Sequence, residues 1–224
     1  MSYKLKPVDI FLIIGNFLIP IYTLFLFLLT PRSVTNFLFF VFVTCAIVER
    51  GWETFKTSKE RKKDELHGDW TLVAVTSTYI ILFFFFVTEF YLKTKPFNPF
   101  ITAVGIALLI ASFRLRLWGM SALGKQWAVH AVGAQKIRKV RLLRIGPYRY
   151  IRHPIYLGIM VEELSFPIIA NAFYSLLFAV FVCLPLVIIR ACEEEKTSLR
   201  RFGDKYLDFK RQVGMFFPTQ LLKR

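Results

Sequence analysis

The segment GPYRYIRHPIYLG, residues 146–158, places basic, aromatic and rigid residues directly before an apolar stretch. Its Gly-Pro step predicts a turn, and Pro154 disfavours helix at His153 but suits the first turn of a following helix. Arg152 and His153 therefore precede a helix N-terminus, where unpaired N–H groups favour a carboxylate. The segment predicts either a binding mouth for an anionic or zwitterionic ligand with an aromatic part, or an anchor at the depth of the lipid headgroups.

A second polar cluster, Arg190 with the adjacent acids Glu193, Glu194 and Glu195, follows the last long apolar stretch. Arg190 and Glu194 are four residues apart, so on a helix they share a face and can pair. Carboxylates at a membrane boundary are costly when they lose their water. One of these acids is suited to bind the ammonium or sulfonium group of a ligand, and the alternative is a solvated helical turn just beyond the membrane.

The elements that must position these clusters are long apolar stretches in a chain of 224 residues that is 55% hydrophobic. Val8–Thr30 and Thr71–Leu92 each reach the length of about 20 residues that crosses a bilayer. The first is too long for the core of a signal peptide and has no small-residue cleavage site before Pro31, so we expect a retained helix. The weaker apolar stretches are Val34–Val48, Phe97–Phe113, Ile155–Ala170 and Ala172–Ile189.

These stretches predict an all-α integral membrane protein with about six transmembrane helices, or five if the short second stretch does not cross. The last two stretches are joined at Asn171 and predict a tight helical hairpin that Pro167 and Pro185 kink. Beyond the hairpin, apolar residues recur at steps of three and four, interrupted at Gly203, which predicts an amphipathic helix along the membrane surface. These apolar residues are Leu199, Phe202, Tyr206 and Phe209.

The net charge of +15 indicates orientation in a membrane rather than nucleic-acid binding. With the N-terminus inside, all of the 30 lysines and arginines except Arg32, Lys93 and Lys95 fall in the predicted inside segments. This asymmetry follows the positive-inside rule and also attracts anionic lipid. We expect a multi-pass membrane protein with both termini on the cytoplasmic side and the lipid bilayer as partner, while the oligomeric state stays open.

The remaining chemistry-bearing residue types give weaker signals. The cysteines, Cys45, Cys183 and Cys192, have no spacing typical of a metal or redox site, and we expect small core residues rather than disulfides. No Ser-His-Asp pattern or phosphate loop occurs, and the three histidines are too scattered to suggest a metal site.

Taken together, the two polar clusters resemble the isoprenylcysteine carboxyl methyltransferase family and are similar to the related phospholipid N-methyltransferases. The family pattern is G-x-Y-x-x-x-R-H-P-x-Y-x-G, then R-x-x-x-E-E-x-x-x-L-x-x-x-F-G-x-x-Y with small spacing variation. Both halves occur in order, separated by a hairpin of the expected size, and the resemblance covers roughly Arg114–Pro218. The matching residues are Gly146, Tyr148, Arg152, His153, Pro154, Tyr156, Gly158, Arg190, Glu194, Glu195, Phe202, Gly203 and Tyr206.

The resemblance implies an enzyme, an integral-membrane methyltransferase that uses S-adenosyl-L-methionine on the cytoplasmic side and acts on a lipophilic small-molecule or prenylated acceptor. Apolar length and charge predict N-terminal transmembrane helices over residues 1–113, with a charged inside loop, helical or not, at 50–70, and the resemblance implies a catalytic region over residues 114–224. Glu194 would meet the amino or sulfonium end of the cofactor, and Arg190 would hold the carboxylate of an acceptor that has one. The implied cofactor-binding residues are Val140, Arg141, Leu142, Leu143, Tyr148, Arg152, His153, Pro154, Ile155, Tyr156, Gly158, Glu194 and Glu195.

Glu162 and Glu163, inside the apolar stretch after the first motif, depart from the family pattern. An acid at such depth is a functional candidate, and steps from Tyr156 through Met160 to Glu163 keep one helix face. We hypothesise that Glu163, with Glu162, lines the acceptor cavity, has a catalytic role and favours a cationic or hydrogen-bond-donating acceptor. The alternative is an ion pair with an arginine across the bundle, either Arg114 or Arg116.

Several functions stay open at this point. Within a methyltransferase, the acceptor is a prenylcysteine carboxylate, a lipid amine as in phospholipid N-methyltransferases, or a small thiol or other lipophilic molecule. Sterol reductases have a distantly similar C-terminal layout and use NADPH, but they are usually longer, and the intact RHPIYLG and EE motifs favour the methyltransferase. A membrane protein that kept the fold without the activity is the third class, and the intact Arg190, Glu194 and His153 argue against it.

Overall fold

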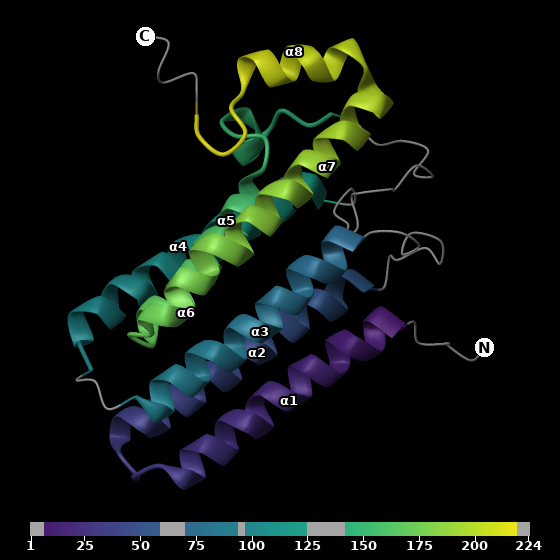
Figure 1. Cartoon of the computed structure of the whole chain (residues 1–224). Coiled ribbons are helices and arrows are strands. Elements are labelled where there is room, and N and C mark those ends of the chain that lie inside the picture. The colour runs from purple at the N-terminus through teal and green to yellow at the C-terminus, as the bar shows by residue number, and fades with distance from the viewer. Residues whose placement is uncertain (1–6, 59–69, 94–96, 125–141, 219–224) are drawn as a thin grey trace.

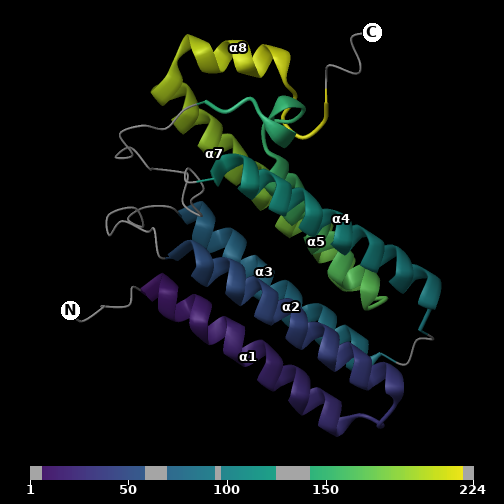
Figure 2. The ribbon, with the colours of Figure 1, turned by 180° about the vertical axis from the view of Figure 1, so that it is seen from behind.

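The structure, a computed structural model, describes residues 7–58, 70–93, 97–124 and 142–218. Over these residues the chain is a bundle of long helices without a β-strand, as the apolar stretches predict (Figures 1 and 2). The long helices are α1 (Pro7–Leu29), α2 (Val34–Ser58), α3 (Trp70–Leu92), α4 (Pro99–Leu123), α5 (Pro154–Ile169) and α7 (Leu184–Phe202). Shorter elements are the 3₁₀ turn η2 (Gly146–Arg149), α6 (Phe173–Phe178), the π-helical turn η3 (Ala179–Cys183) and α8 (Asp204–Gln212).

Within the described residues, four helical segments are long and apolar enough to cross a membrane. They are Val34–Gly51 within α2, Trp70–Leu92, Pro99–Leu123 and the continuous Phe173–Phe202, which joins α6, η3 and α7. Helix α5 has 16 residues, about 24 Å at 1.5 Å per residue, which is shorter than a hydrocarbon core of about 30 Å. The structure therefore supports a multi-pass membrane protein with four candidate spans, whereas the sequence predicts six.

The second helix extends into the predicted charged segment. The sequence predicts a charged inside loop, helical or not, at residues 50–70, and α2 continues through Arg50 to Ser58. Arg50 is therefore a helical residue, next to Glu49 in α2, and not a residue of an irregular loop. Its side chain is only 19% exposed and reaches into the bundle.

Glycine lets α4 and α5 pack with their backbones close together. A Cβ atom on Gly105 would lie 2.7 Å from Cγ1 and 2.8 Å from the main-chain nitrogen of Ile169, and one on Gly119 would lie 2.7 Å from Cγ1 of Ile155. Close approach through small residues is the usual packing of helices inside a membrane, where van der Waals contact drives association. This packing fixes α5, and the segment that precedes it, against α4.

The predicted hairpin between α5 and α6 forms at Asn171, whose φ of 54° lies in the left-handed region that asparagine tolerates. The Asn171 side chain accepts a hydrogen bond of 3.1 Å from the main-chain nitrogen of Asn98 and donates one of 2.8 Å to Oγ1 of Thr102. Beside it, the Glu89 carboxylate accepts hydrogen bonds from the main-chain nitrogen and the hydroxyl of Ser175 at the start of α6. The hairpin is therefore held by α3 and by the start of α4.

Aromatic rings join the N-terminal helices to the C-terminal ones. Phe166 of α5 stacks on Phe86 of α3 with ring centroids 5.7 Å apart, and Phe86 meets Phe39 of α2 edge-on at 6.2 Å. All three rings are buried. Many large apolar side chains elsewhere, such as Phe17 on α1 and Phe181 on η3, are exposed, which is the surface that a lipid environment requires.

The C-terminal segment is two helices rather than the single amphipathic helix that the periodicity predicts. Gly203, with a φ of 54°, ends α7 and begins α8, which lies across one end of the bundle (Figure 1). The apolar face of α8 is buried against the protein itself, where Tyr206 and Phe209 pack on Leu142 and Phe202. The location of this segment along a membrane surface stays a prediction.

Candidate functional site

The two polar clusters of the sequence meet at Glu195, at the end of the bundle that α8 covers (Figure 1). Both Nε and Nη2 of Arg152 lie 2.7 Å from Oε1 of Glu195, and Nζ of Lys210 lies 2.8 Å from its Oε2. His153 Nε2 is 3.3 Å from Oε1. Glu195, Arg152 and His153 are all buried, so these charge-assisted contacts are made largely without water.

Main-chain hydrogen bonds hold the segment before α5 to the segment after α8. The main-chain nitrogen of Arg152 donates to the carbonyl of Gly214 at 2.9 Å, and that of His153 donates to the carbonyl of Met215 at 3.1 Å. The Arg152 guanidinium also donates to the carbonyl of Val213. Arg152 and Glu195, both predicted cofactor residues, are thus used inside the protein, and they position the loop that carries the other predicted residues.

Tyr148 and Glu194, two further predicted cofactor residues, lie close together beside that cluster. Tyr148 belongs to η2 and Glu194 to α7. Burial raises the pKa of the Tyr148 phenol above its ordinary value, and the negative charge of Glu194 raises it further. Glu194 is partly buried and forms no ion pair with any residue that the structure describes. It is therefore a carboxylate that can still accept a cation.

His153 is the residue that precedes α5, and the sequence pattern places it correctly. Its ring lies 5.6 Å from the ring of Tyr156 and 6.1 Å from the ring of Phe216, measured between centroids. Pro154 occupies the first turn of α5 and is buried. The helix N-terminus is consequently bordered by an imidazole and two aromatic rings, a setting suited to an anionic group with an aromatic part.

Arg190 is buried, at 3% exposure, and lies between α7 and α3. Its Nη1 donates a hydrogen bond of 2.9 Å to Oγ1 of Thr71. Among the ion pairs of the described residues there is none between Arg190 and Glu194, although the sequence suggests one. The two side chains are instead engaged on different neighbours, Arg190 with Thr71 and Glu194 beside Tyr148.

The other predicted cofactor residues differ in what they contact. Leu142 packs on the apolar face of α8, Leu143 is half-buried, and Ile155 contacts Gly119 of α4. Gly158 does permit a close approach, but the approaching group is Arg116 of α4, whose Cγ would lie 2.5 Å from an added Cβ. Val140 and Arg141 lie outside the described residues.

A second buried charge cluster, centred on Glu162, was not predicted as a whole. Arg50 of α2 and Arg116 of α4 each form an ion pair with Glu162 of α5, which is 1% exposed. Arg116 also reaches Glu49 at 2.8 Å, and Tyr79 of α3 donates to Glu162 at 3.3 Å. The pairing with Arg116 is one of the alternatives that the sequence leaves open, whereas Arg50 was assigned to a solvated loop.

Glu163, the catalytic candidate next to this cluster, is completely buried. Neither of its carboxyl oxygens has a hydrogen-bond partner in the structure. The adjacent acids Glu162 and Glu163 therefore differ sharply in their surroundings, although the sequence gives them the same environment.

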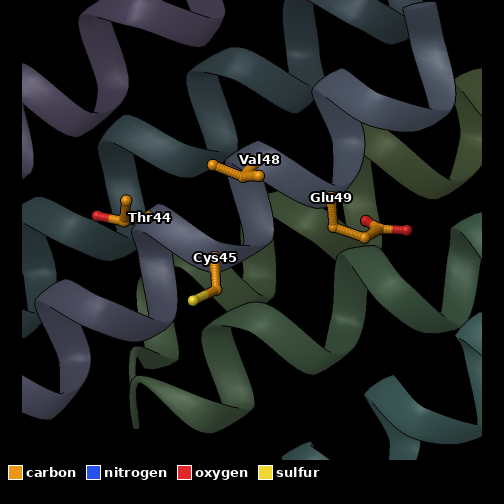
Figure 3. Close-up of a pocket in the computed structure, with 4 residues that line it drawn as sticks. All are labelled: Thr44, Cys45, Val48 and Glu49. Atoms are coloured by element: carbon orange, nitrogen blue, oxygen red, sulfur yellow. The ribbon is translucent and has the colours of Figure 1, made fainter. Parts of the chain in front are cut away.

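A groove on α2 is a further feature that the sequence does not reveal. Four side chains of α2, Thr44, Cys45, Val48 and Glu49, line it (Figure 3). Their spacing, one and four residues apart, is that of one helix face. Because Glu49 pairs with Arg116 of α4, the groove lies on the side of α2 that faces the C-terminal helices. Cys45 is exposed here, as is Cys192, and of the three cysteines only Cys183 is the core residue that we expected.

The C-terminal half of the described helices matches a known protein family. The model of the isoprenylcysteine carboxyl methyltransferase (ICMT) family matches residues 104–200, from α4 to the second polar cluster. Over these residues the chain is similar to the isoprenylcysteine carboxyl methyltransferase family. The match confirms the resemblance drawn from the sequence. It supports the predicted membrane methyltransferase, and hence an enzyme, over the sterol reductase and the non-enzymatic alternative.

Three relatives show how far the similarity extends. The protein named "Uncharacterized protein YpbQ" of Bacillus subtilis is 25% identical and covers 75% of this chain and 100% of its own length. Protein-S-isoprenylcysteine O-methyltransferase of Saccharomyces cerevisiae is 28% identical over 52% of this chain, and methanethiol S-methyltransferase 1 of Bradyrhizobium diazoefficiens is 34% identical over 32% of it. The chain spans only 48% and 24% of these two named methyltransferases.

Proposed function

We propose that this protein is an integral-membrane methyltransferase that uses S-adenosyl-L-methionine to methylate a lipophilic acceptor. The observation that carries the proposal is the arrangement around Glu195. Glu195 joins the two motifs, and its neighbour Glu194, which has no ion-pair partner among the described residues, acts electrostatically on Tyr148. Such a constellation binds a zwitterion more readily than it binds an uncharged ligand.

The side chains at this end fit the charges of that cofactor. Glu194 offers a carboxylate to its ammonium or sulfonium group, and the N-terminus of α5 with His153 offers N–H donors to its carboxylate. Tyr148 and Tyr156 offer rings that suit adenine. When bound, this cofactor supplies an electrophilic methyl group on sulfur, so that the acceptor gains the methyl group and S-adenosylhomocysteine leaves.

Arg190 is assigned to the acceptor side of the site. It lies four residues, about one helical turn, before Glu194 on α7. Its hydrogen bond to Thr71 fixes the guanidinium in a buried position, where it can hold an acceptor carboxylate by a charge-assisted hydrogen bond. The protein would contribute orientation and exclusion of water.

The same proposal includes the topology. The described N-terminal end of α1, the start of α3, the end of α4 and helix α8 gather at one end of the bundle (Figures 1 and 2). We assign this end, with the cofactor site, to the cytoplasmic side, because the basic segments of the sequence lie there. If α1 and α5 cross together with the four candidate spans, both termini lie on that side.

A small thiol is the second candidate acceptor, next to a prenylcysteine carboxylate. It is favoured by the match to methanethiol S-methyltransferase 1, which is 34% identical over 71 residues. A thiol acceptor does not need Arg190 as a carboxylate holder, so the two acceptors predict different effects of an Arg190→Gln variant. A lipid amine is the third outcome of the same test.

The test is calorimetric binding of S-adenosylhomocysteine and, separately, of NADPH to the full chain in detergent. Methyl transfer from labelled S-adenosylmethionine to a farnesylcysteine derivative, to 1-octanethiol and to phosphatidylethanolamine then identifies the acceptor. We expect binding of S-adenosylhomocysteine that is weakened in Glu194→Gln and unchanged in Glu193→Gln. Binding of NADPH alone would move the protein to the reductases, and binding of neither ligand would contradict the proposal.

A further inference from the structure

Glu163 carries a buried carboxyl group without a partner among the residues that the structure describes. It is 0% exposed, and neither of its oxygens has a hydrogen bond within these residues. Buried polar groups in folded proteins are nearly always hydrogen-bonded, and an unpaired one costs free energy. A position of this kind therefore needs an explanation in the function of the protein or in a ligand that the structure does not contain.

The charged side chains described next to Glu163 pair with other residues. Arg50 and Arg116 both bind Glu162, and Arg116 also binds Glu49. Arg50 is held further by a hydrogen bond of 3.1 Å to the Tyr79 hydroxyl. Among the described residues none pairs with Glu163, so a donor group on the acceptor would be the first partner that these residues leave room for.

The depth of Glu163 relative to the proposed site follows from helix register. On α3 and α7, Thr71 bonds to Arg190, and seven residues further into the bundle the Thr78 carbonyl meets the Cys183 thiol at 3.9 Å. Tyr79, the residue after Thr78, donates a hydrogen bond to Glu162, the chain neighbour of Glu163. Seven residues of helix correspond to about 10 Å, so Glu163 lies about 10 Å deeper in the bundle than Arg190.

The π-helical turn η3 is a second unusual feature at this depth. It spans Ala179–Cys183 and so includes Cys183, whose thiol lies 3.9 Å from the Thr78 carbonyl. π-helical turns are rare and are found frequently at functional sites, because they break the regular hydrogen-bond ladder and change the spacing of side chains. An unpaired carboxyl and an irregular helix thus coincide at one level of the bundle, where α3, α5 and α7 meet.

We propose that Glu163 is an acceptor-binding residue that recognises a hydrogen-bond donor, a hydroxyl or an amine, carried by the lipophilic acceptor about 10 Å from its methyl-accepting atom. This inference rests on the proposed methyltransferase function and names its substrate class. The acceptor is apolar along its length but polar at both ends. Glu162, by contrast, holds the helices together and does not contact the acceptor.

The test compares acceptors that differ only at the far end, namely 1-octanethiol, 8-mercapto-1-octanol and 8-amino-1-octanethiol. Binding to the full chain in detergent, with S-adenosylhomocysteine present, is followed by calorimetry and by infrared difference spectra of the Glu163 carboxyl band, identified by its loss in Glu163→Leu. We expect the two donor-bearing thiols to bind about 10–100-fold more tightly than 1-octanethiol and to shift the band. Glu163→Leu should abolish the preference, and Glu163→Gln should keep it for the hydroxyl only.

The stability of the variants separates recognition from a structural role. An unpaired buried carboxyl does not hold the fold, so Glu163→Leu should unfold at the same temperature as the natural protein or at a higher one. A lower unfolding temperature with unchanged acceptor preference would make Glu163 structural and overturn the proposal. Equal binding of all three thiols by the natural protein, or no band shift with any of them, would overturn it too. If the natural protein does not bind S-adenosylhomocysteine at all, the methyltransferase function itself is contradicted.

Discussion

Two pairs of adjacent glutamates, Glu162–Glu163 on α5 and Glu194–Glu195 on α7, have the same sequence pattern and divide their tasks in the same way. In each pair one carboxylate holds arginine side chains inside the protein, Glu162 with Arg50 and Arg116, and Glu195 with Arg152. The other member of each pair has no ion-pair partner among the described residues.

The two unpaired acids differ in depth. Glu194 is partly exposed at the end of the bundle, whereas Glu163 is fully buried within it. Consecutive residues on a helix point about 100° apart, so one member of each pair faces an arginine of a neighbouring helix and the other does not. In each pair, one acid stabilises the structure by pairing with arginine, and its neighbour is left to bind a ligand.

The largest effect is expected from the acid that joins the two motifs. Glu195→Gln leaves the buried Arg152 without its carboxylate, and breaking a buried ion pair costs about 3–5 kcal/mol of unfolding free energy. Thermal and denaturant unfolding in detergent measure this loss. The matched control is Glu193→Gln, because the pair of Glu193 with Lys196 is exposed and is expected to contribute less than about 1 kcal/mol. Equal stability of the two variants would show that Glu195 is not a structural centre.

Glu162 should be nearly as sensitive as Glu195. Glu162→Gln removes the charge that Arg50 and Arg116 share, and we expect a loss of about 3 kcal/mol, the lower end for a broken buried pair, because Arg116 keeps Glu49 and Arg50 is partly exposed. Thermal unfolding in detergent measures this loss, and a Glu162→Gln variant as stable as the natural protein would exclude a structural ion pair.

A smaller effect is expected where helix packing, rather than charge, sets the geometry. Gly105→Ala places a methyl group 2.8 Å from the main-chain nitrogen of Ile169, and overpacking of this kind costs about 1–3 kcal/mol. Gly51→Ala in α2 is the control, because nothing lies within 4 Å of its added Cβ. That variant should be neutral or gain up to about 1 kcal/mol from helix propensity. If both variants unfold alike, the close packing of α4 on α5 is not real.

The smallest effect on stability, and the largest on binding, is expected for Glu194→Gln. Its carboxylate holds no described partner, so the unfolding free energy should change by less than about 0.5 kcal/mol. The dissociation constant for S-adenosylhomocysteine should rise about 10–100-fold, the value of one hydrogen bond to a charged group. Calorimetry of Glu194→Gln beside Glu193→Gln measures it, and equal affinities would remove Glu194 from the site.

Much of the architecture can be predicted from local pattern. The long apolar stretch around Phe86 predicts a helix of membrane-crossing length, and Asn171 marks the predicted hairpin, whereas the continuous helix around Phe181 is longer than its apolar stretch predicts. Two stretches behave differently from the rest. Helix α5 is too short to span a bilayer by itself, and α2 runs on through Arg50, because helix length depends on what each end packs against and not only on hydropathy.

The motifs predict which residues lie near one another better than they predict what each residue contacts. His153, Tyr148 and Glu194 come together at one end of the bundle, as their motif implies. Gly158 is a glycine because Arg116 lies against it, a contact between residues 42 positions apart that no local pattern contains. The groove on α2 and the charge cluster at Glu162 also depend on α2 facing α4, which periodicity does not specify.

The helical membrane fold, the hairpin and the two motifs can be predicted from the sequence alone, because they follow from apolar length, turn residues and spacing along one chain. Which glutamate of each pair is neutralised, and which is left to bind, depends on the tertiary structure. That outcome depends on whether a long arginine side chain from another helix, Arg50 or Arg116 for Glu162, reaches one helix face or the next. The distance between helices is set by glycine and aromatic packing across the bundle, and it has no counterpart in the local sequence.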